Sequence, residues 1–237
     1  MRSLTRRVLL AAPATLFAET KPKVLLPSDQ PDEHGFRLMW YNPVPPIDQP
    51  KWQLEVKGLV ERPAKFSLDQ LRALPQEQQS SRMKCVQCWS ARTTWGGFRF
   101  HSLLDLVKPK RTAKAIRIDC ADKWYEYMTM NEMANPRVLL AMSMAGKPLP
   151  DNHGAPLRLI DPSKYGYKSA KLITSITFVE EGKGSMACDI GPYYSATGEI
   201  LAGYDTPLDL VPQAAGKGWK LDPKFKRKIT GGEITEY

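Results

Sequence analysis

Prolines interrupt this chain along its whole length, and they restrict its fold more than any other feature of its composition. There are 20 prolines among 237 residues. A proline ends a helix or a central strand because it lacks the backbone N–H and fixes φ. The chain is therefore expected to be rich in loops and short strands, and a helical bundle is not expected. Its length and its 42% apolar residues allow a substantial core, in one large domain or two small ones.

The first 18 residues have the features of an export signal. Arg6 and Arg7 form an arginine pair, and an apolar run over residues 8–18 follows it. This order is typical of the twin-arginine signals with which bacteria export folded proteins. The run is too short to span a bilayer comfortably, and no other segment approaches transmembrane length. We therefore expect a periplasmic protein with no transmembrane span in its mature chain.

The remaining sequence predicts an α+β domain over residues 19–180 and an irregular C-terminal extension over residues 181–237. The extension is expected to pack on the domain or to bind a partner. Ser67 and Gln70 have the spacing of a capping box, which predicts a short helix over residues 67–74. A second helix is expected over residues 101–107. Short apolar segments predict strands over residues 52–60, 115–119, 125–129, 139–142, 157–160 and 172–179.

The formal net charge of +9 does not by itself indicate a nucleic-acid-binding protein. The basic residues are scattered along the chain, and no nucleic-acid-binding motif accompanies them. Part of the positive charge suits an anionic cofactor or an acidic redox partner. We therefore expect no nucleic-acid partner.

Four cysteines are too few for a disulfide scaffold in a chain of this length. They are Cys85, Cys88, Cys120 and Cys188, and the first two form the only Cys-x-x-Cys pattern. Taken alone, that pattern fits a structural disulfide, a dithiol oxidoreductase or part of a zinc site, and it leaves these alternatives open. No Cys-x-x-Cys-His pattern follows it, so the sequence carries no motif for haem attachment.

Three blocks of sequence carry the clearest indication of function. Residues 82–90 are Arg-Met-Lys-Cys-Val-Gln-Cys-Trp-Ser, residues 153–158 are His-Gly-Ala-Pro-Leu-Arg, and residues 164–171 are Lys-Tyr-Gly-Tyr-Lys-Ser-Ala-Lys. In this order and at these separations they resemble the molybdopterin-binding core of the sulfite oxidase family. The resemblance is strongest to the haem-free bacterial branch, which includes periplasmic methionine sulfoxide reductases. It covers residues 36–180 and implies the mixed α+β fold of the sulfite oxidase molybdenum domain.

The resemblance implies a Mo-molybdopterin cofactor, with one molybdenum per chain. Cys85 matches the family's thiolate ligand to the metal, and soft sulfur ligands suit such a centre. Tyr193 and Tyr194 are expected on the substrate side, from their position alone. The residues that match or lie near cofactor-binding positions of the family are Tyr41, Asn42, Cys120, His153, Arg158, Ser169, Ala170 and Lys171.

The activity implied by this resemblance is oxygen-atom transfer on a small, sulfur-containing substrate, of the sulfoxide reductase or sulfite dehydrogenase type. Electrons would be exchanged with a separate c-type cytochrome or membrane haem protein. Alignment on Pro43 and Pro45 places Met39-Trp40-Tyr41 where sulfite-oxidising members have an Arg-Asn-His cluster, which counts against sulfite. Two alternatives remain: a non-catalytic binding module on the same fold, and a dithiol oxidoreductase that uses Cys85 and Cys88.

Overall fold

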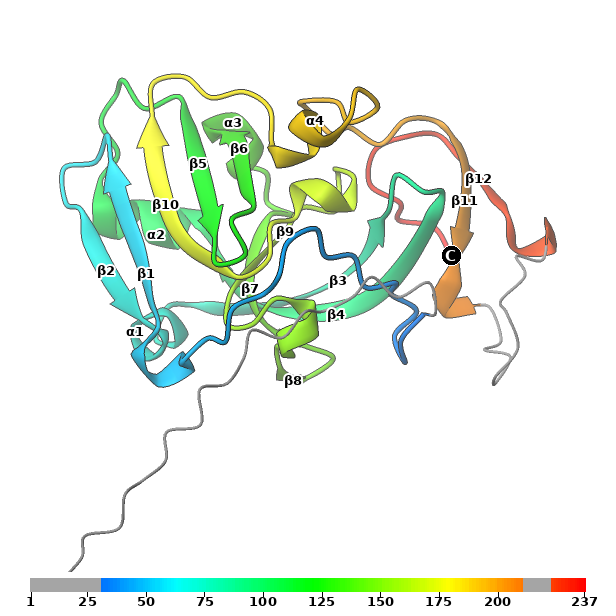
Figure 1. Cartoon of the computed structure of the whole chain (residues 1–237), viewed down its shortest axis with the longest axis horizontal. Helices are drawn as coiled ribbons and strands as arrows, with labels where there is room; N and C mark the ends of the chain where they lie inside the picture. Colours follow the sequence, from blue (N-terminus) through cyan, green and yellow to red (C-terminus); the bar gives the residue numbers. More distant parts are fainter. Residues whose placement is uncertain (1–30, 211–222) are drawn as a thin grey trace, which may run out of the picture.

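Two mixed β-sheets and a few short helices make up the structure, a computed structural model that describes residues 31–210 and 223–237 (Figure 1). This arrangement confirms the expected α+β class. The predicted export signal lies outside the described residues. Within them, no helix combines the length and the apolar character needed to cross a bilayer.

The first sheet has five strands in the order β2-β1-β10-β5-β6 and lies on the left in Figure 1. β1 and β10 are parallel, and the other neighbours are antiparallel. Leu54 and Val56 of β1 are buried, as expected from alternating polar and apolar residues. Four of the predicted strands are confirmed here, and only β2 was not expected. The bounds are β1 Gln53–Gly58, β2 Ala64–Ser67, β5 Ala115–Cys120, β6 Tyr125–Thr129 and β10 Ile173–Val179.

The second sheet is built on a long antiparallel hairpin, β3–β4, which pairs from Gln76↔Phe98 to Lys84↔Ser90. β7 pairs with β4, and β9 pairs with β7. β7 and β9 confirm predicted strands, whereas β3 and β4, the two longest, were not predicted. The bounds are β3 Gln76–Lys84, β4 Trp89–Arg99, β7 Leu139–Met144, β8 Lys147–Pro148, β9 Arg158–Ile160, β11 Gly203–Pro207 and β12 Arg227–Ile229.

The helices are short, and local capping sets the start of two of them. Ser67 Oγ accepts a hydrogen bond from the Gln70 N–H, and the Gln70 side chain accepts one from the Ser67 N–H, so the predicted capping box is confirmed. Thr129 and Glu132 form a second capping box that was not predicted. The helices are α1 Leu68–Arg72, α2 Phe100–Val107, α3 Met130–Met133 and α4 Met186–Ile190.

The C-terminal extension has more regular structure than the sequence led us to expect. It contributes α4, β11 and β12, and the two strands form the far edge of the second sheet, on the right in Figure 1. β11 runs parallel to β4, with Thr206 opposite Trp89. The extension therefore lies directly beside the loop that joins β3 to β4.

The two largest of the four apolar clusters among the described residues hold these layers together. The larger one packs the five-stranded sheet against α1, α2 and the end of β4, and it contains Leu54, Ile118 and Phe178. The smaller one packs around Trp95 in the second sheet. At the β-bulge between β4 and β7, a Cβ on Gly97 would overlap the carbonyl oxygen of Leu140, so only glycine fits there.

Candidate cofactor and active site

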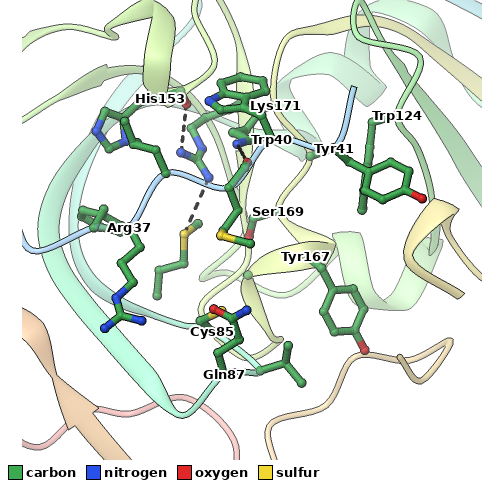
Figure 2. A pocket seen from close by; sticks show the side chains of 18 of the residues that line it. Arg37, Trp40, Tyr41, Cys85, Gln87, Trp124, His153, Tyr167, Ser169 and Lys171 are labelled. Atoms are coloured by element: carbon green, nitrogen blue, oxygen red, sulfur yellow. Dashed lines mark hydrogen bonds between the residues drawn. The ribbon is translucent and has the colours of Figure 1, made fainter. Parts of the chain in front are cut away.

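One cavity brings the three sequence blocks together. It has a volume of about 290 Å³ and lies between the two sheets' loops (Figure 2). One wall is residues 36–41, which we call the N-terminal strap. The other walls come from the β3–β4 loop, the turn before β9, and the turn over residues 166–171. The first block supplies residues 83–87 and 89 of this lining, the second supplies His153 and Arg158, and the third supplies residues 166, 167 and 169–171.

Cys85 is the first residue after β3, at the start of the β3–β4 loop. Its N–H donates to the Trp89 carbonyl at 2.7 Å, which closes a tight turn. The thiol is half-buried and lines the cavity. Burial raises the pKa of this thiol, and the positive charges of Lys84 and Arg37 oppose the increase. Such a thiol is a weak nucleophile by itself, but metal coordination would deprotonate it.

Cys88 differs from Cys85 in each of these respects. It is exposed, it does not line the cavity, and its φ of 65° lies in the left-handed region. All four cysteines are free, so the structural disulfide that the Cys-x-x-Cys pattern permits is not formed. Among the described residues, no cluster of three or more His, Cys, Asp or Glu side chains could hold a metal, which leaves a zinc site unsupported.

Arg158 presents a buried cation to the cavity from β9. Its Nη1 donates to the His153 carbonyl at 2.9 Å, its Nη2 lies 3.6 Å from Met83 Sδ, and its guanidinium carbon lies 4.8 Å from the Trp95 ring centroid. Within residues 31–210 and 223–237, its Nε has no hydrogen-bond partner and no carboxylate forms an ion pair with it. Burial lowers the pKa of Arg158 to about 9. A cation held in this way favours binding of an anion.

Lys171 is a second basic side chain that lines the cavity, in addition to Arg158. Its Nζ donates to the Met39 carbonyl of the N-terminal strap and lies 3.5 Å from the Trp40 ring centroid. Loss of hydration and the charge of Arg158 lower the pKa of Lys171 to about 7. Figure 2 shows Lys171 and Trp40 across the cavity from Cys85 and Gln87.

The Lys171 pKa predicts how the stability of the cofactor-free protein depends on pH. The folded protein loses this proton near pH 7, whereas an unfolded lysine keeps it to about 10.5. Because the unfolded state then binds more protons, the free energy of unfolding rises with pH across this window. Wild type should therefore gain stability relative to Lys171→Met between these pH values. Urea unfolding of both proteins checks this, and parallel pH profiles would contradict it.

His153 is held by the segment that precedes the strap. Its Nε2 lies 2.6 Å from Asp32 Oδ2, and Phe36 packs edge-on against its ring. Burial lowers the pKa of His153, and the hydrogen bond to Asp32 opposes this. The imidazole thus uses one nitrogen to fasten the chain over the cavity, a contact that the sequence did not predict.

Ser169 and Ala170 are buried in the cavity wall. Both of their N–H groups donate within the turn, to the Gly166 and Lys168 carbonyls, and Ser169 Oγ accepts from the Asp161 N–H. The two residues therefore shape the wall, and their N–H groups are already bonded.

A buried ion pair fastens this turn to the rest of the fold. The Lys168 ammonium pairs with the Glu126 carboxylate and also donates to the carbonyls of Tyr127 at 2.9 Å and Ala196 at 3.0 Å. Both side chains are fully buried. Burial raises the pKa of Glu126 to about 8, although the charge of Lys168 opposes this. Lys168 thereby links the third sequence block to β6 and to the C-terminal extension.

The structure does not bring every expected residue to the cavity. Tyr41 and Tyr194 line it, whereas Asn42, Cys120 and Tyr193 do not. Asn42 points to Met186, with Nδ2 3.5 Å from its sulfur. Cys120 is buried at the end of β5, and Tyr193 is 78% exposed.

Several lining residues were missed in the sequence analysis. Arg37 is the most important, because it lines the cavity and its charge acts on Cys85. It precedes the positions where the family alignment placed the substrate arginine, and so it was not considered. An arginine within the apolar run Phe36-Arg37-Leu38-Met39-Trp40 is the signal that was available. Gln87, Trp124 and Tyr167 also line the cavity and were not predicted.

Comparison with known proteins agrees with this architecture. Residues 41–187 match the family described as the oxidoreductase molybdopterin-binding domain. The chain is 38% identical over 146 residues to a protein-methionine-sulfoxide reductase catalytic subunit of Ralstonia nicotianae, which covers 55% of this chain and 44% of that one. It is 33% identical over 147 residues to the corresponding subunit of Campylobacter jejuni, covering 55% and 50%. The chain thus matches about half the length of these relatives.

A solved structure shows the same fold. The sulfane dehydrogenase SoxCD of Paracoccus pantotrophus superimposes with a TM-score of 0.57 over 94% of this chain and 63% of that one, at 14% identity. The protein described here belongs to the oxidoreductase molybdopterin-binding domain family, of the sulfite oxidase type. The predicted family, fold class and cofactor class are therefore confirmed.

The side chains around the cavity suit this cofactor. Cys85 offers a sulfur ligand, while Arg158 and Lys171 offer positive charge to a phosphate-bearing pterin. The buried indole N–H groups of Trp40 and Trp89, together with Arg158 Nε, have no hydrogen-bond partner among the residues that the structure describes. Buried donors without partners are rare, and a ligand rich in acceptors would satisfy them.

Proposed function

We propose that this protein is a periplasmic molybdopterin oxidoreductase that reduces sulfoxides, with methionine sulfoxide in polypeptides as the substrate class. The observation that carries the proposal is the free Cys85 thiol at a cavity that also gathers Arg158 and Lys171. In the reaction, a sulfoxide, two protons and two electrons give a thioether and water. The similarity to protein-methionine-sulfoxide reductase catalytic subunits supports this direction of oxygen transfer.

The cofactor would be Mo-molybdopterin, with one molybdenum per chain. Cys85 would hold the metal through its thiolate. Arg158 and Lys171 would bind the phosphate and pterin, with Ser169 and Ala170 shaping the wall and His153 holding the segment above it. When bound, the cofactor supplies the two-electron chemistry of oxygen-atom transfer. The protein binds the cofactor, orients it and excludes water.

One side of the cavity suits a thioether or sulfoxide side chain. Tyr41, Trp124, Tyr167 and Tyr194 are among the residues that line the cavity, and Figure 2 shows the first three together on one side. The Tyr167 and Tyr194 rings meet edge to face at 5.1 Å between centroids. Aromatic rings make favourable contacts with divalent sulfur and exclude water.

Tyr194 is the hydroxyl donor that we assign to the substrate. Burial raises the pKa of its phenol, so it stays protonated at neutral pH and can donate a hydrogen bond to a sulfoxide oxygen. Tyr41 is assigned to the same side, and it is 59% exposed. Asn42, Cys120 and Tyr193 lie outside the lining and have no part in the proposal.

Electrons would come from a separate c-type cytochrome or membrane haem protein, because the sequence has no haem attachment motif. Export through the twin-arginine pathway fits a protein that must fold around its cofactor before it crosses the membrane. The arginine pair at residues 6 and 7 supports this location.

Turnover assays test the function directly. The matured enzyme should oxidise a reduced viologen dye when it is given a peptide that contains methionine sulfoxide. A parallel assay with sulfite and an electron-accepting dye measures whether the enzyme oxidises sulfite instead. Sulfite oxidation without any sulfoxide reduction would overturn the proposal.

Arg37 favours a second candidate, a sulfite-type oxyanion as substrate. A cation beside the metal ligand would bind such an anion, and the family alignment had suggested that this cation is missing. We nevertheless favour sulfoxide, because aromatic rings line part of the cavity and the matched relatives are sulfoxide reductases.

Arg37→Met separates these two candidates. Sulfite should compete with sulfoxide in wild type, and the variant should weaken this inhibition roughly 10-fold or more, because a charge-assisted contact is lost. The KM for the neutral sulfoxide should change much less. Steady-state inhibition kinetics give both constants. An equal loss of sulfoxide and sulfite binding would contradict the assignment of Arg37 to anions.

A further inference from the structure

Asp205, in the C-terminal extension, contacts both ends of the loop that carries Cys85. Its carboxylate is fully buried. Oδ1 forms an ion pair with Lys84 Nζ at 2.9 Å, but the angles of this contact are not those of a hydrogen bond. Oδ2 accepts hydrogen bonds from Ser90 Oγ and, at 3.0 Å, from the Tyr237 hydroxyl. Lys84 comes directly before Cys85, and Ser90 is the second residue of β4.

The backbone of β11 adds a contact in the middle of the same loop. The Thr206 N–H donates to the Cys88 carbonyl at 3.0 Å, and Thr206 and Pro207 pair with Trp89 and Ser90. β11 thus meets the loop before it, within it and after it. It also lies beyond residues 41–187, the part of the chain that matches the family.

The β3–β4 ladder, which ends at the pair Lys84↔Ser90, and a hydrogen bond from the Cys85 N–H to the Trp89 carbonyl close the loop. Within the loop, Cys88 has a φ of 65° that a non-glycine residue rarely adopts. Such a conformation persists only where its surroundings enforce it. Lys84 is 3% exposed and Asp205 is 0% exposed, so this ion pair lies in the protein interior. Buried pairs of this kind often add little net stability and can instead select one arrangement.

We propose that Asp205 is a positioning residue for Cys85, because its carboxylate anchors the Lys84 and Ser90 side chains at the two ends of the loop and so keeps the thiol at the cavity. The role of Cys85 as a metal ligand rests on the proposed function. The order that Asp205 gives to the loop is a property of the chain alone, and the two parts can be tested separately.

Three variants of the full chain test the positioning role. Asp205→Asn removes the charge with little change of shape. Lys84→Met combined with Asp205→Asn leaves no unpaired charge in the interior, so this protein should fold even if the single variant does not. Glu233→Gln is the matched control, because it breaks an ion pair between the same extension and Arg137 of the body. Neither Glu233 nor Arg137 lines the cavity.

Hydrogen–deuterium exchange on cofactor-free protein reads the order of the loop. Amides of residues 85–89 should exchange roughly 10-fold faster or more in both Asp205 variants, with β5 unchanged, because local opening governs their protection. Glu233→Gln should leave this segment as protected as in wild type. Unchanged exchange in the double variant would overturn the proposal, and so would equal acceleration in the control.

A spectroscopic measurement on cofactor-loaded protein links loop order to the metal. The visible absorption of the loaded enzyme depends on the thiolate ligand, so it should shift in the Asp205 variants and match wild type in Glu233→Gln. If wild type itself binds no molybdenum, the proposed function fails while the exchange result still decides the role of Asp205. If exchange accelerates but the spectrum is unchanged, Asp205 orders the loop without positioning the thiol, and the proposal is wrong.

Discussion

Cys85→Ser is expected to abolish sulfoxide turnover while the protein stays folded. Serine has nearly the same size, but its hydroxyl does not replace a soft thiolate on molybdenum. Loss of residues that only orient metal ligands costs about 10- to 100-fold, so loss of the ligand itself should exceed ~100-fold in kcat. Dye-coupled assays, with molybdenum content measured on the same sample, give the result.

Cys88→Ser is the matched control for this prediction. Cys88 is exposed and lies outside the cavity lining, so its replacement should leave turnover unchanged. Equal damage from both variants would instead support the dithiol oxidoreductase, in which both sulfurs take part. Turnover that survives in Cys85→Ser would contradict the assigned metal ligand. No turnover in wild type, with a partner still bound, would support the non-catalytic module.

Arg158→Met should have opposite effects on cofactor binding and on the stability of the cofactor-free protein. Its buried guanidinium has no carboxylate partner in the described ranges, so an apolar side chain should stabilise the empty protein by on the order of 1 kcal/mol. Loss of charge-assisted hydrogen bonds should weaken cofactor binding by about 3 kcal/mol, or roughly 100-fold. Urea unfolding and cofactor retention after gel filtration measure the two effects.

Arg137→Met provides the comparison for Arg158. Arg137 forms a bidentate ion pair with Glu233 away from the cavity, at distances of 2.6 to 3.0 Å. Its replacement should cost some stability and leave cofactor retention intact. If Arg158→Met destabilised the empty protein and kept the cofactor, the guanidinium would have a structural role, and its assignment as an anion-binding group would be wrong.

Four of the five strands of the first sheet could be predicted from the sequence because they show a periodic pattern. Strands such as β1 alternate apolar and polar residues, since one face packs on the core. The capping box at Ser67 and Gln70 likewise predicted α1 from local chemistry alone. The sequence patterns that predict these elements lie within a few neighbouring residues.

The β3–β4 hairpin could not be predicted, because its side chains are satisfied by distant parts of the chain. β3 is polar, and its buried Arg82 pairs with Asp209 at 2.8 Å, more than a hundred residues away. β4 is buried on both faces, which removes the alternation that marks a half-exposed strand. The C-terminal extension, which buries this hairpin, was expected to be irregular because its strands also depend on contacts with distant parts of the chain. Its strands form by pairing with β4 and with each other.

The same distinction applies to the candidate site: residues in recognisable motifs were predicted, and residues placed only by tertiary contacts were not. Cys85, His153, Arg158 and Lys171 were predicted because each stands in a block with a recognisable order of residues, and the structure brings them to one cavity. The N-terminal strap has no such motif. Its place in the wall depends on tertiary contacts, such as that of Lys171 with the Met39 carbonyl. Arg37 was therefore missed.

Metal and pterin analysis of the folded protein tests the central claim most directly. Protein purified from a host that makes molybdopterin should contain one molybdenum and one pterin per chain, the latter detected by fluorescence after oxidation. Both should be lost from Arg158→Met and retained in Arg137→Met. Well-folded wild-type protein that contains neither molybdenum nor pterin would contradict the account.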